Sequence, residues 1–520
     1  MSAFNTSITL FRGVPLDEKY NVVFSLKNID FYSFLLQEFT YKDYSNYSIV
    51  KDNTFRVYTE TTTSGNTCDY LKTFNYISFK NHNSFTGNKR FFAFIDNVRY
   101  INDNCVEISY TIDVWHTFIS DITLKDSYIN RCHSTTDNFG DNVIPEPLNF
   151  NCDYVYSGSI KDNIINKLMY VLVTNETPGT ATEHDGIYSP CNYSIYHTDA
   201  TGIQALNDMI SNYNITPDKI VNLYVAPSFL LGWETTGGVT PVMDSFANGS
   251  DPTTAIGVFN RNKTRTVTYG SAQTVLTALN LKNQKTFTAP FCFFNVNNGG
   301  AGQSMDLRYE YFDNGTPELY IEATYVAPVK VICKPHSYKG YSSNIVPHES
   351  ISLDNYPTCA YQNDAYMNWL VNAGVPMVAS GVLSSAGGSG AVGGTVSSFV
   401  GGTYKAMNSA PIMGGNTNSG NVNVAHQEQT FYVACKHLPE NVLKSVDAFF
   451  TRYGYQQNTI YTPNLESRQR YTYIQSDNIE FIGPVSTNAR NKIKDIFKSG
   501  VTIWKTSAYN HFGDYSDNPI

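Results

Sequence analysis

The sequence predicts a mainly β protein of the α+β class, with several domains, a few short helices and one long loop rich in Gly, Ala and Ser. Three observations predict this class. The chain has 520 residues, which is enough for two to four domains of usual size. Aromatic residues make up 14% of the chain and charged residues only 16%, and aromatic side chains are typical of strands. Short apolar or alternating runs are separated by Asn, Gly and Pro, as expected for many strands and turns.

The first 150 residues are predicted to form strands. Residues 106–114 alternate between apolar and polar with a period of two, and 91–95 and 55–63 are two further strand candidates. In this alternation Asp113 falls on the polar side. We therefore interpret Asp113 as an exposed or lumen-facing residue, although its carboxylate and that of Asp121, near His116, also raise the possibility of acid–base chemistry.

The middle of the chain has a looser pattern. The continuous apolar run 167–173 predicts a central strand, 221–226 predicts another strand, and 201–212 has helical spacing. Residues 308–322 predict a β-hairpin, because Asn314-Gly315 stands between two alternating runs. The Gly-, Ser-, Thr- and Asn-rich stretch 235–254 predicts a loop.

The C-terminal part is predicted to be ordered again after a short helix at 360–370. The predicted elements are a strand at 430–435, a helix at 441–453, strands at 471–475 and 478–482 around a turn, a helix that Asn488 caps and Gly500 ends, and a closing strand at 501–504.

The stretch between these parts is unusual in composition. Between Asp364 and Glu428 only Lys405 is charged, and most other residues are Gly, Ala, Ser, Val, Asn and Thr. Such a run buries too little apolar area to build a core, and it lacks the charge of a solvated linker. Three interpretations compete: a flexible linker, a segment held in a channel and released later, and a membrane-active segment.

A regular spacing of small residues favours the membrane-active interpretation. Small residues recur at every fourth position, a spacing that lets helix backbones approach closely in lipid: Ala386, Gly390, Gly394, Ser398, Gly402, Ala406, Ala410 and Gly414. However, each glycine costs nearly 1 kcal/mol in a helix, and no block of ~20 strongly apolar residues exists. The tract is therefore not an ordinary transmembrane helix, and its composition alone does not decide between the alternatives.

The sequence offers no constellation for catalysis or metal binding. Phosphate loops, dinucleotide-binding glycines, zinc-protease helices and nucleophile elbows are all missing, and the net charge of −9 argues against a binder of phosphate backbones. The nine cysteines are scattered, which favours isolated buried thiols over disulfides or zinc. Cys333 and His336 lack a second ligand pair, and His184-Asp185 is better explained as a solvated loop. We predict no enzyme activity, no cofactor and no metal.

The N-terminal residues contain no basic segment followed by an apolar one, so we expect no secretory signal and synthesis in a reducing cytoplasm.

Several segments near both ends of the chain carry a resemblance to a known family. They lie at 91–95, 110–115 and 128–131 near the start, and at 449–455, 462–465, 470–475 and 499–504 near the end. In their order and spacing they resemble the tail knob proteins of small short-tailed phages that infect Gram-positive bacteria. The resemblance covers roughly residues 10–135 and 360–515, and it places the low-charge tract where that family carries a long hydrophobic loop.

This resemblance implies a tube-forming protomer of β-barrel or sandwich domains, assembled as a homo-hexamer at the distal tip of the tail. Implied partners are proximal tail or lower collar proteins, genomic DNA that passes through the lumen without specific binding, and the host cytoplasmic membrane. The six long loops would plug the lumen until ejection and then perforate that membrane. The expected location is the virion, after synthesis in the host cytoplasm.

Residues of the low-charge tract are the candidate functional residues. Most would make apolar contacts and the glycines would allow close approach: Val375, Val378, Val382, Leu383, Gly390, Val392, Gly394, Val396, Phe399, Val400, Gly402, Met407, Ile412 and Met413. This tract is poorer in Leu, Ile and Phe than a strong pore former would be.

The predicted organisation has five parts. They are an N-terminal β-rich tube domain (1–150), a middle β-rich region (151–350), a connecting helical region (351–372), the low-charge plug or membrane-active loop (373–427) and a C-terminal α+β part that completes the tube (428–520). Two alternatives stay open: a structural or receptor-binding tail protein whose tract is only a linker, and a tail-associated cell-wall-degrading enzyme, for which the sequence offers no catalytic residues.

Overall fold

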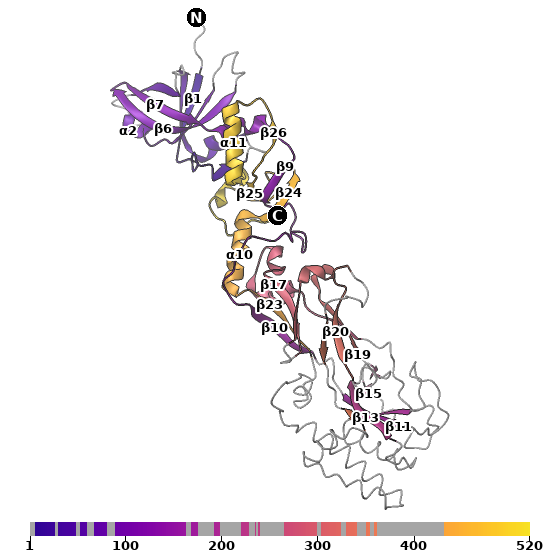
Figure 1. The fold of residues 1–520 in the computed structure, drawn as a ribbon. Helices are drawn as coiled ribbons and strands as arrows, with labels where there is room; N and C mark the ends of the chain where they lie inside the picture. Colours follow the sequence, from indigo (N-terminus) through magenta and orange to yellow (C-terminus); the bar gives the residue numbers. More distant parts are fainter. Residues whose placement is uncertain are drawn as a thin grey trace, which may run out of the picture. The chain divides into compact units, whose positions relative to one another are not determined.

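Figure 1 shows the fold of the chain in a computed structural model. The structure describes residues 6–25, 30–47, 53–59, 67–80, 89–162, 168–174, 192–197, 220–227, 234–235, 238–239, 265–298, 303–323, 329–340, 350–353, 358–360 and 431–520. The chain divides into two compact units. Unit 1 contains Met1–Asn151, Leu281–Thr286 and Glu440–Ile520, and unit 2 contains Cys152–Asn280 and Phe287–Pro439.

Unit 1 is built on two larger sheets and one short strand pair. The six-stranded sheet has the order β3 (Thr40–Tyr47), β1 (Thr6–Arg12), β5 (Tyr76–Lys80), β6 (Arg90–Asn102), β7 (Cys105–Ile112), β4 (Thr54–Tyr58). The five-stranded sheet has the order β2 (Val22–Phe24), β27 (Val501–Trp504), β25 (Tyr471–Gln475), β9 (Ser127–Cys132), β24 (Tyr455–Tyr461). The short pair joins β26 (Phe481–Ile482) to β8 (Thr123–Leu124).

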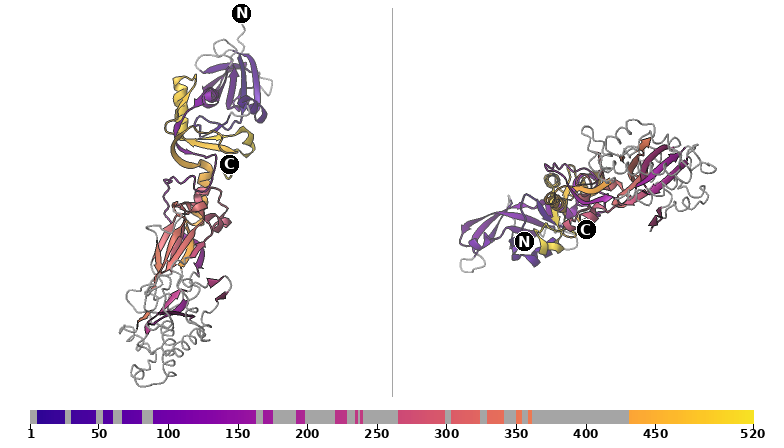
Figure 2. Two further views of the ribbon diagram at one scale, coloured as in Figure 1. Left: turned by 90° about the vertical axis from the view of Figure 1, so that its right-hand side faces the viewer. Right: turned by 90° about the horizontal axis from the view of Figure 1, so that it is seen from below.

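The beginning and the end of the chain form the five-stranded sheet together. Strand β9 pairs antiparallel with both β24 and β25, and β2 runs parallel to β27. Figure 2 shows these indigo and yellow segments side by side. A shared aromatic core includes Phe11 and Trp115 from the first part and Tyr471, Phe497 and Trp504 from the last. Neither part can bury its apolar residues without the other.

The helices of unit 1 are short except for two near the C-terminus. They are α1 (Phe31–Glu38), α2 (Cys68–Leu71), α3 (Val114–Phe118), the 3-10 turn η1 (Ile119–Asp121), α10 (Glu440–Tyr453), α11 (Thr487–Ser499) and η9 (Thr506–His511).

Both long helices confirm the sequence prediction, with one correction. The N-cap of α11 is Ser486, whose hydroxyl accepts from the Ala489 amide, and not the predicted Asn488. The predicted end at Gly500 is confirmed, since this residue has a φ of +86°. A Cβ there would lie 2.0 Å from the Tyr473 hydroxyl oxygen, so only glycine fits.

The predicted alternation in β7 is confirmed, but the interpretation of Asp113 is wrong. Val106, Ile108 and Tyr110 are buried on one face. The strand ends at Ile112, and Asp113 begins α3 as its N-cap, accepting from the His116 amide at 3.1 Å. Asp113 is 0% exposed, because a capping carboxylate turns back toward the helix instead of continuing the strand pattern.

The described residues of unit 2 form three four-stranded sheets and one strand pair. The first has the order β10 (Val155–Asp162), β23 (Phe431–His437), β17 (Cys292–Asn297), β18 (Ser304–Leu307). The second has the order β12 (Asn192–His197), β11 (Leu168–Thr174), β13 (Ile220–Pro227), β22 (Thr358–Ala360). The third has the order β16 (Arg265–Thr268), β19 (Glu318–Ala323), β20 (Val331–His336), β21 (Ile351–Leu353).

Short elements complete the described part of unit 2. They are the strand pair β14 (Glu234–Thr235) and β15 (Gly238–Val239), the helix α6 (Ala272–Val275), and the 3-10 turns η5 (Thr277–Leu279), η7 (Tyr309–Tyr311) and η8 (Asp313–Gly315). A further 3-10 turn, η6 (Gln284–Phe287), lies where the chain passes from unit 1 to unit 2.

The predicted hairpin at 308–322 is wrong. The first half forms the turns η7 and η8, and β19 pairs with β16 and β20 instead. Asn314 and Gly315 do have positive φ values, so the turn signal itself is real. The preceding residues are diverted because Tyr309 and Phe312 are buried against Phe294, which removes them from a strand register.

Most other predicted strands are confirmed. The strands predicted at 91–95, 221–226, 430–435, 471–475 and 501–504 correspond to β6, β13, β23, β25 and β27, of which β23 begins at Phe431. The predicted central strand at 167–173 corresponds to β11, which lies between β12 and β13. The strand predicted at 478–482 shrinks to Phe481–Ile482 and pairs with β8. Gly238–Val239 is a strand inside a predicted loop. The helices predicted at 201–212 and 360–370 fall outside the described residues, apart from Ala360 in β22.

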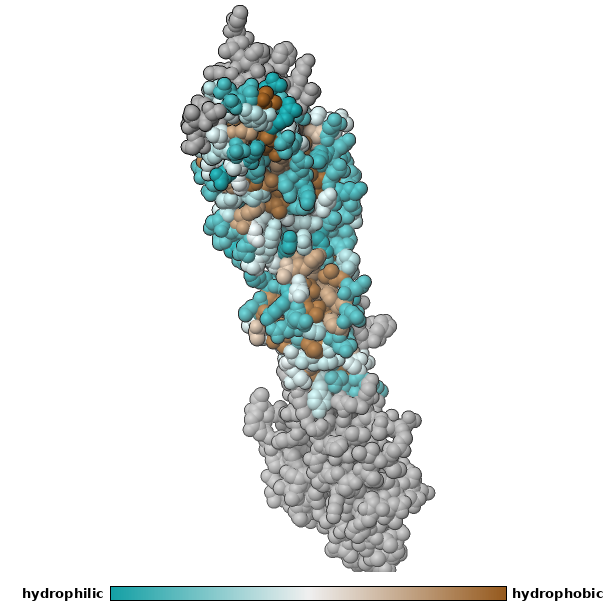
Figure 3. Space-filling model, turned by 90° about the vertical axis from the view of Figure 1, so that its left-hand side faces the viewer, coloured by the Kyte–Doolittle hydropathy of each residue, from teal (hydrophilic) through white to brown (hydrophobic). Residues whose placement is uncertain are grey.

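The fold class is confirmed as mainly β, with a few short helices. On the face drawn in Figure 3, hydrophilic residues are interspersed with smaller apolar areas over the described part of the chain. Exposed large apolar residues in unit 1 include Tyr58, Tyr100 and Ile460.

Candidate functional site

The residues predicted from sequence to be functional lie in the low-charge tract, outside the described residues. The structure does describe the two strands between which the tract is inserted, and both belong to unit 2. The chain leaves β22 at Ala360 and enters β23 at Phe431. These two strands are the roots of the tract.

The two roots differ in how firmly the backbone is held. Among the described residues, β22 is the last strand of its sheet, and its three residues, Thr358–Ala360, pair with β13. Strand β23 lies inside its sheet and pairs with β10 on one side and β17 on the other. Phe431 is 0% exposed at the very start of β23. A strand bonded on both sides with a buried first residue resists fraying more than a short outer strand.

The far end of β23 is fixed by a histidine. His437 donates from Nδ1 to the Leu438 carbonyl at 2.7 Å and accepts at Nε2 from the Ser157 hydroxyl at 2.9 Å. Burial lowers the pKa of His437 below its ordinary value. Both ring nitrogens are used, so His437 ties β23 to β10 and is not available as an acid–base group.

Unit 1 contains a buried polar cluster of seven residues, which we call the polar clamp. Its members come from three distant parts of the sequence: Arg131, Asp137, Glu146, Asn283, Lys285, Asp447 and Tyr455. The clamp holds Leu281–Thr286, the short stretch of mid-chain sequence that belongs to unit 1.

Asp447 binds the backbone of this stretch. Its carboxylate accepts from the Lys282 amide at 3.0 Å and from the Asn283 amide at 2.9 Å. The Asn283 side-chain amide also donates to the Asp447 carboxylate at 2.9 Å and to the Thr451 hydroxyl at 2.8 Å. Several donors on one carboxylate satisfy the charge that burial would otherwise leave unsolvated.

Glu146 binds the side chain of Lys285 within the same clamp. The Glu146 side chain is 0% exposed and that of Lys285 is 2% exposed, with 2.6 Å between Oε1 and Nζ. Arg131 also pairs with Glu146 and donates to the Gly454 carbonyl at 2.7 Å. Burial lowers the pKa of Lys285, an effect that the neighbouring Glu146 carboxylate opposes.

Asp137 completes the clamp on the side of Tyr455. It accepts from the Tyr455 hydroxyl at 2.8 Å and from the Gln284 amide at 3.1 Å. Burial raises the pKa of Asp137 above its usual value. Because the members of the clamp are engaged with one another, the arrangement fixes chain segments and offers no exposed acid, base or nucleophile.

A second buried cluster in unit 1 resembles a catalytic dyad in composition only. His116 Nδ1 lies 2.6 Å from the Asp113 carboxylate, and Nε2 accepts from the Phe24 amide at 3.2 Å. Tyr76 also donates to Asp113 at 2.7 Å. Burial alone would raise the pKa of Asp113, but the His116 ring and the Tyr76 hydroxyl hold it below its usual value. Asp113 and His116 are at most 2% exposed, so no substrate reaches them.

The geometry also bears on the metal candidates. Cys333 and His336 come from alternate faces of β20, with Cys333 buried and the His336 ring 2.9 Å from Glu318. They do not point to a common site. The part of the chain that the structure describes contains no group of three or more potential metal ligands. The seven cysteines whose side chains are described are free thiols, four of them buried.

No helix within the described ranges combines the length and the apolar character needed to cross a membrane.

Comparison with known protein families connects these features to a phage tail. Residues 258–518 match the family model of the C-terminal domain of the tail knob protein gp9 of Bacillus phage phi29. The chain belongs to this tail knob family. Residues 4–123 also match the N-terminal part of caudoviral major tail proteins.

Individual relatives of the tail knob family span most of the chain. The tail knob protein gp9 of Bacillus phage PZA is 25% identical over 86% of this chain and 88% of its own length. The gp9 proteins of phages phi29 and B103 are each 23% identical over similar shares. The resemblance predicted from the sequence is confirmed.

A solved structure supports the fold over the whole length. The tail knob protein gp12 of bacteriophage C1 superposes with a TM-score of 0.67 at 15% identity, covering 99% of this chain and 100% of that one. Together these relatives make the chain a structural protein of the phage tail, located in the virion, rather than an enzyme.

Sequence reasoning missed the polar clamp, although part of its signal was present. Asp447 lies among Leu443, Val446 and Phe450 on the buried face of α10, so a carboxylate interrupts the apolar stripe. Glu146 stands between Pro145 and Pro147. Nothing local in the sequence marks Asn283 or Lys285 as their partners.

Proposed function

We propose that this tail knob protein forms the distal tail tube, a conduit for genome ejection whose low-charge tract plugs the lumen and then helps to penetrate the host cytoplasmic membrane. The supporting observation is the insertion of a tract with one charged residue, Lys405, between two strands of a tail knob protein. The candidate plug residues remain Val375, Val378, Val382, Leu383, Gly390, Val392, Gly394, Val396, Phe399, Val400, Gly402, Met407, Ile412 and Met413.

The unequal roots support a release mechanism. A segment that leaves its stored position has to separate from the folded part at one end while staying attached at the other. The short outer strand β22 suits the end that separates, and the doubly bonded β23 suits the end that holds.

The net charge of −9 supports a passive conduit. Negative surface groups repel DNA phosphates within the Debye length of roughly 8–10 Å, so DNA slides through without binding. In this proposal the assembly is a homo-hexamer, attached to proximal tail or lower collar proteins. The five-part division at 150, 350, 372 and 427 remains our proposal for the functional segments.

The packing role of the small residues is tested by a triple substitution in the phage. Gly390, Gly394 and Gly402 share the four-residue spacing, so replacing all three by Leu blocks close approach of neighbouring copies. We expect assembled tails that plug poorly and infect at least tenfold less well. Infectivity and DNA retention of purified particles are the measurements.

A matched control adds the same three leucines outside the spacing. Gly387, Gly393 and Gly401 belong to the same tract but not to the four-residue series, and their replacement by Leu should reduce infectivity much less. Equal infectivity of both triple variants and the unchanged phage would contradict the packing role. Full infectivity of a phage with a shortened tract would support the alternative in which the tract is only a linker.

A further inference from the structure

The connection between β24 and β25 in unit 1 carries a buried arginine. Both strands pair with β9, one on each side, and both run antiparallel to it. Strand β24 ends opposite Ser127, whereas β25 begins beyond Cys132, so the connecting residues 462–470 run back along the length of β9. Arg468 lies near the end of this connection and is 6% exposed. The fold therefore places a guanidinium inside unit 1, near the Cys132 end of β9.

The Arg468 guanidinium has no protein partner within the described part of the chain. Its Nε is buried and donates no hydrogen bond, and no carboxylate of the described residues forms an ion pair with it. Arg470, two residues further along, is different, because it pairs with Asp514 and Asp517 at 3.4 Å. Since buried charges in proteins are normally paired, the buried and unpaired Arg468 is an exception that needs a physical explanation.

Several side chains close to the guanidinium are neutral and cannot balance its charge. The Arg468 charge acts on Cys132, His133 and Tyr455, which are therefore its neighbours. Burial raises the pKa of Cys132 to about 12 and lowers that of His133 to about 3. Burial also raises the pKa of Tyr455 above its usual value. All three groups are uncharged at pH 7.

An acidic neighbour, Asp137, is engaged with other donors. Burial raises the pKa of Asp137, and the Arg468 charge is among the effects that oppose this rise. However, the Asp137 carboxylate accepts from the Tyr455 hydroxyl at 2.8 Å and from the Gln284 amide at 3.1 Å, and it forms no ion pair with Arg468. A guanidinium cannot lose its proton in a protein, so Arg468 stays charged and its Nε lacks an acceptor.

We propose that unit 1 binds one small monovalent anion, of the size of chloride, on the Arg468 guanidinium. The N–H groups of a guanidinium lie in one plane and hold an anion through more than one hydrogen bond. Because Nε is buried, an anion bonded to it is enclosed by the protein and is small. The anion would offset the buried charge beside the polar clamp, to which Asp137 and Tyr455 belong. This structural role is separate from the proposed function of the tract.

Thermal unfolding of the purified full-length protein tests the proposal. Sodium chloride replaces sodium gluconate at constant ionic strength, and gluconate is too large to be enclosed beside Nε. An anion that binds only the folded state stabilises it by mass action, so the melting temperature should rise by roughly 2 °C or more between about 10 and about 500 mM chloride. Broadening of the chloride NMR signal by the protein measures the binding directly, and bromide should reverse this broadening by competition.

Two variants and one matched control locate the anion. Arg468→Met keeps much of the side-chain length without the charge, so it should lose both the chloride-dependent rise and the NMR broadening. Arg468→Lys keeps the charge without the planar set of N–H groups and should bind chloride several-fold more weakly. Arg452→Met removes an exposed guanidinium that lies over the Tyr515 ring, and it should leave both effects unchanged.

Equal melting temperatures of the unchanged protein in chloride and in gluconate would overturn the proposal. A rise of the same size in Arg468→Met would also overturn it, because a general effect of salt on the protein surface does not require Arg468. If Arg468→Met does not fold, undiminished chloride binding by Arg468→Lys is the contradicting result. None of these results depends on whether the tract acts on membranes.

Discussion

The polar clamp of unit 1 and the roots of the tract in unit 2 hold the chain in opposite ways. In the clamp, buried charges such as Glu146 and Lys285 tie together segments more than a hundred residues apart. At the root β22, three residues are held by backbone pairing to one neighbour. Removal of one partner in the clamp is costly, because the other partner stays charged and buried away from water. The root β22 can open at small cost.

This difference indicates which part of the protein is fixed and which part can move. The clamp joins the first part of the chain, a mid-chain stretch and the last part into one unit of constant geometry. The low-charge tract is inserted between β22, which pairs with β13, and β23, which pairs with both β10 and β17. Three experiments test this difference between the clamp and the roots, beginning with the largest expected effect.

Removing Glu146 should cause the largest loss of stability. Glu146→Ala leaves Lys285 buried without its carboxylate and takes one partner from Arg131. Breaking a buried ion pair in this way costs about 3–5 kcal/mol. Urea unfolding of the purified protein, followed by circular dichroism, measures the change in the free energy of unfolding.

The matched control is Glu440→Ala on α10. Glu440 pairs with Lys444, but both side chains are more than half exposed, so the expected loss is within ~0.5 kcal/mol. Similar losses of unfolding free energy for the two variants would mean that Glu146 stabilises the protein no more than a surface ion pair does.

Acidification should weaken unit 1 through His133. Its Nδ1 accepts from the Tyr473 amide at 2.8 Å and its Nε2 donates to the Thr451 carbonyl at 3.0 Å. Burial, assisted by the Arg468 charge, lowers the pKa of His133 to about 3 from 6.5. The unfolded chain therefore takes up this proton below pH 6.5 while the folded chain does not. The contribution of His133 to stability is complete above pH 6.5 and is lost as the pH falls toward 3.

The slope for one such proton is about 1.4 kcal/mol per pH unit. Urea unfolding at several pH values between 7 and 4.5 should show a steeper loss for the unchanged protein than for His133→Gln. The difference in stability between the two should shrink as the pH falls. Parallel curves would show that His133 takes up its proton equally in the folded and unfolded states.

Hydrogen exchange should show the smallest effect, a difference between the two roots. Amides of Thr358–Ala360 are expected to exchange at least tenfold faster than those of Val433–Cys435, because β22 is short and bonded on one side. Exchange followed by mass spectrometry measures both peptides in one sample. Slower exchange at β22 would reverse the assignment of the separating end.

Local patterns predicted the regular elements of the fold. Patterns between residues a few positions apart are visible in a sequence. They include the apolar–polar alternation of β7, the apolar run of β11 and the apolar face of α10. Asp113 was misjudged because a strand pattern does not show where a helix cap begins. The turn at Asn314-Gly315 was recognised, but tertiary burial of Tyr309 and Phe312 decided which strands pair.

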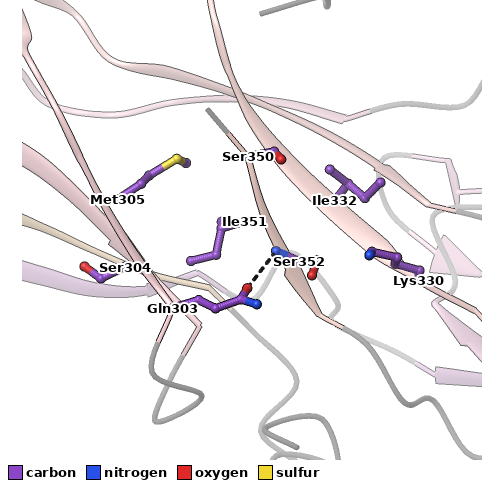
Figure 4. A pocket seen from close by; sticks show the side chains of 8 residues that line it. All are labelled: Gln303, Ser304, Met305, Lys330, Ile332, Ser350, Ile351 and Ser352. Atoms are coloured by element: carbon purple, nitrogen blue, oxygen red, sulfur yellow. Dashed lines mark hydrogen bonds between the residues drawn. The ribbon is translucent and has the colours of Figure 1, made fainter. Parts of the chain in front are cut away.

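The candidate site could be predicted only in part, for a physical reason. The low-charge tract is marked by composition, which a sequence shows directly. The clamp depends on Asn283 and Lys285 meeting Asp447 and Glu146, and no local rule links residues at such separations. The cavity of about 360 Å³ that Figure 4 shows is likewise lined by residues from 303–305, 330–332 and 350–352, and no single segment determines it.

The proposed membrane activity of the tract is tested most directly by dye release from liposomes. Purified, assembled protein is compared with a variant in which residues 374–420 are replaced by a short Gly/Ser linker, at neutral and mildly acidic pH. Our account predicts leakage that requires the tract. Absence of leakage from assembled protein under both conditions would contradict it and leave membrane penetration to another protein.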